Sequence, residues 1–228
     1  MYKYLDNVTS EGGARETGIY VFISVFIILV VIFAVVFSNN QLNTAYIHHG
    51  FLGTDWFEDI GERDSGSQFF GLEKFSSLTY RIDGKYPSYL TIMTIKTLVM
   101  MSENELRDKT AESIEKELVK GILVDKTTEI SGERMLKNEH NTMYIVFDGN
   151  DTSKNPSEKI KIIVEVWRCK TSGTSVICIG FAQITDNLHG NSELNIDHWK
   201  KIVRDGVGTF GTGDFLGEDG LIFNVICH

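Results

Sequence analysis

Hydrophobic residues in this chain follow three patterns: one long unbroken run, several alternating segments and two segments with helical spacing. The unbroken run extends from Ile19 to Phe37, contains no charged residue, and has Ser24 as its only conspicuously polar member. About twenty apolar residues in a helix match the thickness of a bilayer's hydrocarbon core. A helix also satisfies its own backbone polar groups where lipid offers no partners. We therefore expect a transmembrane helix over Ile19–Phe37.

The residues around this run favour a retained anchor over a cleaved leader. Lys3 and Arg15 precede it together with three acids, and the polar exit at residues 38–41 contains no Ala-x-Ala site. A signal peptide would have a basic start and a small-residue cleavage site. Glycines ahead of the run leave a processed, pilin-type helix as an alternative. No Lys or Arg follows the run before Arg63, so the positive-inside rule predicts a cytoplasmic N-terminus in the cell membrane and an extracytoplasmic C-terminal domain.

The remaining pattern divides the chain into further parts. Residues 1–18 form the expected short cytoplasmic segment, and residues 19–37 form the single-pass signal-anchor helix. Residues 38–73 show little periodicity and are expected to form a juxtamembrane stalk. Residues 74–228 are expected to form one extracytoplasmic domain.

Alternation of apolar and polar residues predicts strands in most of that domain. A strand that is apolar on both faces, as over Tyr89–Met101, is typical of the centre of a sheet. The turn at Lys170–Gly173 predicts a hairpin between its two flanking segments, and the first of these, which alternates, should have one buried face. The predicted strands are Phe75–Ile82, Tyr89–Met101, Thr127–Leu136, Thr142–Asp148, Lys159–Cys169, Thr174–Ile184 and Leu221–Cys227.

Two segments have helical spacing. Ser102 and Glu105 form a capping-box motif that predicts the start of a long amphipathic helix ending near Gly121. A short amphipathic helix is expected over Ile196–Asp205. Together with the strands, these helices predict an α+β fold: a mostly antiparallel sheet with one long and one short helix.

Charge limits the classes of partner. The 228 residues include 22 Lys and Arg and 31 Asp and Glu, a net charge of −9. The first 44 residues contain two of the bases and three of the acids, so the rest carries −8. An acidic domain lacks the basic surface that nucleic acids require. The expected partners are therefore the lipid bilayer, through the N-terminal helix, and a protein partner or further copies of the chain.

Three cysteines suggest disulfide chemistry. Cys169 and Cys178 lie on the two arms of the predicted hairpin, where cross-strand neighbours can be bridged with slight adjustment. An extracytoplasmic location would favour oxidation. The sequence therefore predicts a Cys169–Cys178 disulfide, with buried free thiols as the alternative. Cys227 is left over; it could pair with either, link to a partner or stay buried.

Metal and cofactor motifs are weak. The six histidines (His48, His49, His140, His189, His198 and His228) show no metal-binding spacing, and a site that combines some of them with Cys227 is a minor alternative. The glycine-rich segment Gly206–Gly220 follows a predicted helix and has no lysine, unlike a phosphate-binding loop. Its acids lack the order of a calcium loop. We therefore predict no cofactor and no resident metal.

Catalytic motifs are absent from the sequence as well, since no nucleophile-elbow, Ser-x-x-Lys or His-Glu-x-x-His pattern occurs. Asn150 begins an Asn-Asp-Thr sequon in a predicted exposed loop, so glycosylation is expected there where the host has the machinery. The sequence thus predicts a non-catalytic single-pass membrane protein that displays a binding or assembly domain. A filament or membrane-complex subunit is the first alternative. An extracytoplasmic hydrolase, recognised by His189 or His198 beside a Ser, Cys or Asp, is the second.

Overall fold

The structure is a computed structural model, and it describes residues 42–68, 73–97, 102, 105–106, 110, 121–190, 194–203 and 220–228. The predicted helix Ile19–Phe37 and the cytoplasmic segment before it lie outside the described residues. So do most of the predicted helix after Ser102 and nearly all of Gly206–Gly220.

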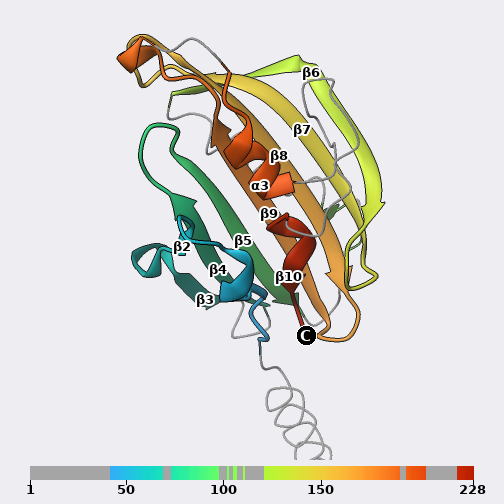
Figure 1. Cartoon of the computed structure of the whole chain (residues 1–228). Helices are drawn as coiled ribbons and strands as arrows, with labels where there is room; N and C mark the ends of the chain where they lie inside the picture. Colours follow the sequence, from blue (N-terminus) through green and yellow to red (C-terminus); the bar gives the residue numbers. More distant parts are fainter. Residues whose placement is uncertain are drawn as a thin grey trace, which may run out of the picture. The chain divides into compact units, whose positions relative to one another are not determined.

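An antiparallel sheet of eight strands makes up most of the described chain (Figure 1). Its order is β2-β4-β5-β9-β8-β7-β6, and β3 also pairs with β4. The strands are β2 (Phe57–Glu58), β3 (Asp64–Gln68), β4 (Glu73–Ile82), β5 (Ser88–Thr97), β6 (Ile122–Met135), β7 (Asn141–Asp151), β8 (Glu158–Cys169) and β9 (Thr174–Gln183). A second, two-stranded sheet pairs β1 (Tyr46–Ile47) with β10 (Val225–Ile226).

The fold class predicted from the sequence is wrong. The described residues form a mainly antiparallel β structure with the α-helix α3 (Asp197–Val203), a few described residues of a helix after Ser102, and short 3-10 turns. Within these residues no helix has the length and apolar character needed to cross a bilayer. The α+β class with a transmembrane and a long helix is therefore corrected to a mainly β fold, because long paired strands dominate the described residues.

One face of the sheet is covered by α3 and by the C-terminal segment (Figure 1). Trp199 and Ile202 of α3 are fully buried against this face. Gly180 of β9 permits the close contact, since a Cβ there would lie 2.7 Å from Ile202 Cγ2 and 2.8 Å from Ile163 Cγ2. The short amphipathic helix was thus predicted correctly, and its apolar side packs on the centre of the sheet.

The opposite face of β8 and β9 is buried as well, which corrects the prediction of one buried face for β8. Val164 and Val166 pack there with Leu106, while Ile160 and Ile162 pack with Phe181. The alternating polar residues of β8 point to the α3 side and are buried in pairs. Lys161 Nζ lies 2.6 Å from Asp148 Oδ1, and Glu165 pairs with Arg134. Because each of these charges is paired, the side chains can be buried. The alternation of apolar and polar residues in β8 therefore does not mark a solvent-exposed face.

Residues 42–68, within the segment expected to be a stalk, belong to the sheet and its core. Ala45, Ile47, Leu52 and Trp56 are buried in the same cluster as the α3 face. The backbone N–H of Ala45 donates to Thr94 Oγ1 at 2.8 Å. Lack of periodicity in this segment reflects very short strands, which leave no repeat to detect.

The predicted capping box is confirmed. Glu105 N donates to Ser102 Oγ at 3.2 Å, and Ser102 N donates to Glu105 Oε2 at 2.7 Å. Leu106, Glu105 and Thr110 are helical, and Leu106 is fully buried. The reciprocal bonds satisfy two backbone donors at the start of this helix.

The C-terminal strand is shorter than predicted. In place of a strand over Leu221–Cys227, the chain forms a 3-10 turn, η6 (Ile222–Asn224), followed by the two residues of β10. Its apolar residues Leu221 and Ile222 are buried in the α3-side core. The hydrophobic residues of this segment therefore pack against the eight-stranded sheet and do not form one of its strands.

Candidate metal centre

His140 and Cys169 are brought together by the register of neighbouring strands. β7 and β8 pair from Met143 with Val166 onward. Extending this register by three residues places His140 beside Cys169, the last residue of β8. The turn before β7 supports the position, since the N–H of Leu136 donates to the carbonyl of His140 at 2.9 Å and Glu139 adopts a left-handed φ of 61°.

Cys227 and His228 reach the same place from the end of the chain. β10 pairs with β1, with Tyr46 opposite Ile226. Asn138 Nδ2 donates to the carbonyl oxygen of Val225 at 3.1 Å, which joins β10 to the β6–β7 turn. Cys227 and His228 follow directly, so three separate parts of the chain meet at one end of the sheet.

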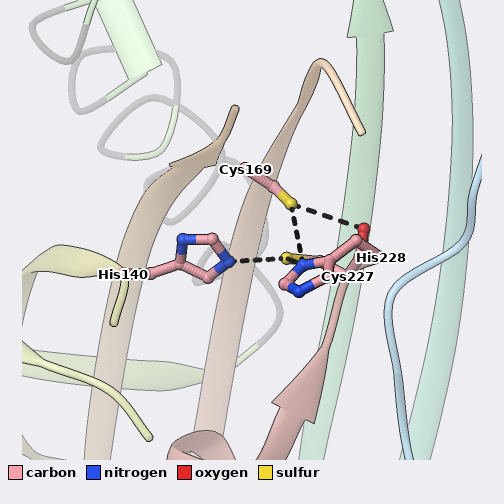
Figure 2. A group of neighbouring side chains, drawn as sticks. All are labelled: His140, Cys169, Cys227 and His228. Atoms are coloured by element: carbon pink, nitrogen blue, oxygen red, sulfur yellow. Dashed lines mark hydrogen bonds between the residues drawn. The ribbon is translucent and has the colours of Figure 1, made fainter. Parts of the chain in front are cut away.

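The four side chains point toward one another (Figure 2). Cys227 Sγ lies 3.1 Å from His140 Nε2 and 3.8 Å from His228 Nδ1, and Cys169 Sγ lies 3.6 Å from His228 Nδ1. All four atoms lie within 4.8 Å of one another. The two sulfurs are buried, His140 is half-buried and His228 is exposed, so the cluster opens to solvent on its imidazole side.

These separations approach those of a tetrahedral metal site. With Zn–S of about 2.3 Å and Zn–N of about 2.0–2.1 Å, tetrahedral angles place sulfur and nitrogen ligands about 3.5 Å apart and two sulfurs about 3.8 Å apart. The three sulfur–nitrogen distances given above, 3.1 to 3.8 Å, bracket the value for sulfur and nitrogen ligands. A contraction of about 1 Å in the longest separation would complete the tetrahedron, which side-chain rotation can provide.

The two thiols act on each other's pKa in opposite directions. A hydrogen bond from Cys227 lowers the pKa of Cys169 to about 4 against the effect of burial, and donors on Ser172 and His228 add to this. The pKa of Cys227 is raised by the same bond and by burial. When Cys169 is protonated, its thiol donates to the Cys227 carbonyl at 3.4 Å. Cys169 is therefore the more acidic thiol of the pair, and a thiolate is the form that binds metals.

The structure does not bring Cys169 and Cys178 together. β8 and β9 pair Cys169 with Thr174 and Glu165 with Cys178. The two cysteines are thus four residues apart in register, about 13 Å along the strands, and a disulfide requires Cα atoms within about 7 Å. All three cysteines are free and buried. The hairpin was predicted correctly, but its loop has four residues fewer than the loop that a Cys169–Cys178 bridge would require.

His198 lies beside a serine and His189 beside an aspartate, but neither histidine is arranged as the general base of a hydrolase. His198 Nδ1 lies 3.3 Å from Ser88 Oγ and 2.6 Å from the carbonyl oxygen of Tyr86. A carbonyl only accepts, so Nδ1 carries a proton and cannot take one from Ser88. Ser88 Oγ itself donates to the Tyr86 carbonyl at 3.1 Å, and Ser88 is buried.

His189 Nδ1 lies 2.7 Å from Asp186 Oδ1, an arrangement that orients the imidazole. The described contacts of His189 include no serine or cysteine that it could activate. Within the described residues, neither His189 nor His198 is therefore placed to activate a serine or cysteine nucleophile.

The sequon residue Asn150 lies in β7, opposite Leu123 of β6 and Lys159 of β8, and not in the predicted loop. Asn150 is nonetheless exposed. The loop itself is shorter than expected, because β7 continues to Asp151 and β8 begins at Glu158.

Comparison with known proteins gives no match: no family model, no curated protein and no solved structure is significantly similar to this chain. The candidate site therefore stands on its geometry alone.

Sequence reasoning considered a metal site that combined histidines with Cys227, but not these four residues together. His140 and Cys169 are separated by a whole hairpin, and Cys227 and His228 are adjacent, so no ligand spacing recurs in the sequence. The detectable signal was the strand pairing, since the predicted strands Thr142–Asp148 and Lys159–Cys169 place His140 and Cys169 at the same end of neighbouring strands.

Proposed function

We propose that this domain binds one divalent, thiophilic metal ion of the zinc type through His140, Cys169, Cys227 and His228. The observation that carries the proposal is the convergence of two sulfurs and two imidazole nitrogens, all within 4.8 Å, from three parts of the chain. Two cysteines and two histidines are the donor set of many structural zinc sites.

Charge favours a divalent ion. Two thiolates and two neutral imidazoles carry a total charge of −2, which a divalent ion neutralises. Because the sulfurs are fully buried, a net charge left at the site would be costly to desolvate. Sulfur and imidazole donors favour zinc over calcium or magnesium, which prefer oxygen.

The metal's role follows from the number of ligands. Four protein ligands leave no coordination position for a substrate, whereas catalytic zinc sites keep one open. The ion would join the β6–β7 turn, the end of β8 and the C-terminal residues after β10. We therefore propose a non-catalytic binding or assembly domain whose fold is completed by the metal.

The test is the metal content of the purified protein. Elemental mass spectrometry should find about one zinc per chain, as expected for one site with four protein ligands. Exchange with Co²⁺ should give the ligand-field absorption of a tetrahedral ion and a sulfur-to-cobalt charge-transfer band. Cys227→Ser and His140→Ala should each weaken Co²⁺ binding strongly, because each removes one of four ligands.

Cys178→Ala is the matched control, since it removes a buried cysteine that lies away from the site. This variant should bind Co²⁺ like the wild type, with circular dichroism confirming that each variant is folded. A folded wild type that retains no metal and gives no charge-transfer band with Co²⁺ would refute the proposal.

A further inference from the structure

Two buried tryptophans have an indole N–H without a hydrogen-bond partner: Trp167 and Trp199. Both side chains are at most 1% exposed. A buried donor left unsatisfied costs about 1–3 kcal/mol, so each such group in a native structure calls for an explanation.

Trp167 lies beside the candidate metal centre. It precedes Cys169 by two residues on β8, and side chains at that spacing share one face of a strand. Trp167, Cys169 and Cys227 are buried in one cluster on the α3 side of the sheet. Trp199 belongs to the same cluster, but on α3, where Lys161 Nζ lies 5.5 Å from its ring.

The indole of Trp167 is close enough to the Cys227 thiol to influence it, and both side chains are buried in the same cluster. The pKa of the Cys227 thiol is raised mainly by its hydrogen bond to Cys169 and by burial, and the Trp167 indole opposes this by favouring the thiolate. A neutral thiol is a weak acceptor, whereas a thiolate is a strong one. An unpartnered donor in this cluster would therefore gain an acceptor if the Cys227 sulfur were a thiolate.

A bound metal creates that state, because a thiol must be deprotonated to become a ligand. The Cys169 sulfur likewise has hydrogen-bond donors beside it, namely the backbone N–H and the hydroxyl of Ser172. Both sulfurs therefore have nearby donors that favour their thiolate forms.

We infer that Trp167 is a positioning residue of the metal centre, whose indole N–H donates to the metal-bound thiolate of Cys227. The inference rests on the proposed metal site. Metal binding then supplies Trp167 with the partner it otherwise lacks, and the N–H···S bond fixes the sulfur and stabilises its negative charge. Groups that orient metal ligands in this way typically contribute about 10–100-fold to affinity.

The test compares Trp167→Phe with Trp199→Phe in the full chain, with Co²⁺ as the probe. Both changes remove an unpartnered indole N–H from the same core and leave an aromatic ring. Trp167→Phe should weaken Co²⁺ binding about 10–100-fold and move the sulfur-to-cobalt band to longer wavelength, because the sulfur lone pairs lose a hydrogen bond. Trp199→Phe should change neither.

A second measurement uses the wild-type protein and is independent of the variants' folding. In NMR spectra, the indole N–H resonance of Trp167 should move downfield when zinc is added, while that of Trp199 stays in place. Unchanged Co²⁺ affinity and band position in a folded Trp167→Phe, or an unmoved Trp167 resonance, overturns the role of Trp167 and leaves the metal site standing. A wild type that binds no Co²⁺ overturns both.

Discussion

The carboxylate of Glu165 is fully buried below α3, and its charge is neutralised by one arginine. Arg134 Nε and Nη2 lie 2.8 and 2.5 Å from its two oxygens, and Thr142 Oγ1 donates to it at 2.6 Å. Arg134 also donates to the carbonyl of Val203 at 3.0 Å, at the end of α3. This single arginine thus joins an edge strand, a central strand and the helix that covers them.

Removing Arg134 should be strongly destabilising. Arg134→Met leaves the Glu165 carboxylate buried without a counter-charge, and breaking a buried pair typically costs about 3–5 kcal/mol. Urea denaturation followed by circular dichroism measures the change in the free energy of unfolding. The double variant Arg134→Met/Glu165→Leu should recover much of the loss, because it removes both charges.

The less buried pair Arg63–Glu58 is the control, with the Arg63 side chain 52% and the Glu58 side chain 12% exposed. Arg63→Met should cost much less than Arg134→Met, because solvent screens the charge of Arg63. Equal losses in Arg63→Met and Arg134→Met would show that burial does not decide the energetics here.

At the scale of elements, the sequence predicted the features that a local pattern of residues determines. It did not predict those that depend on pairing between distant segments. The hairpin around Gly173 and the capping box of Ser102 were predictable because a few adjacent residues determine them. The strand β1 and the place of the C-terminal segment were not, since each depends on a partner nearly the whole domain away in sequence. The candidate metal centre lies where these distant pairings meet, so its four side chains show no common spacing in the sequence.

The short strand β1 is anchored by Tyr80 of β4, and this contact predicts a pH dependence. The hydroxyl oxygen of Tyr80 accepts from the N–H of Ile47 at 2.9 Å, and burial raises the pKa of Tyr80 to about 12. In the unfolded chain a tyrosine ionises near pH 10. The stability contributed by neutral Tyr80 is therefore fully present below about pH 10 and is lost as pH rises toward 12.

An ultraviolet titration of the folded protein should show one tyrosine that ionises about two units later than an ordinary one. Tyr80→Phe should abolish this late step and should lower stability at neutral pH by about 1 kcal/mol, because Ile47 loses its acceptor. A titration in which all tyrosines ionise near pH 10 while the sheet remains folded would contradict the prediction.

On the scale of the whole molecule, residues 42–228 form one compact unit whose two ends meet. The strand β1 near its start pairs with β10 near its end, and the proposed metal ligands Cys227 and His228 follow β10 directly. The closure of the fold by β10 is only two residue pairs long, too short to be stable by itself. A metal ion at this point would therefore stabilise the entire domain and not only its own neighbourhood.

Metal removal should accordingly lower the temperature of unfolding. An ion that binds only the folded state at a free concentration about 1,000 times its Kd adds about 4 kcal/mol of stability. In a domain of this size that corresponds to an increase in Tm of about 8–16 °C. Scanning calorimetry of the chelator-treated protein, before and after zinc is restored, measures the difference. Cys178→Ala should show the full shift, because its ligands are intact, and Cys227→Ser should show little of it, because its folded state holds zinc weakly. A Tm that does not change with zinc would mean that the four side chains lie close together without a metal's contribution to the fold.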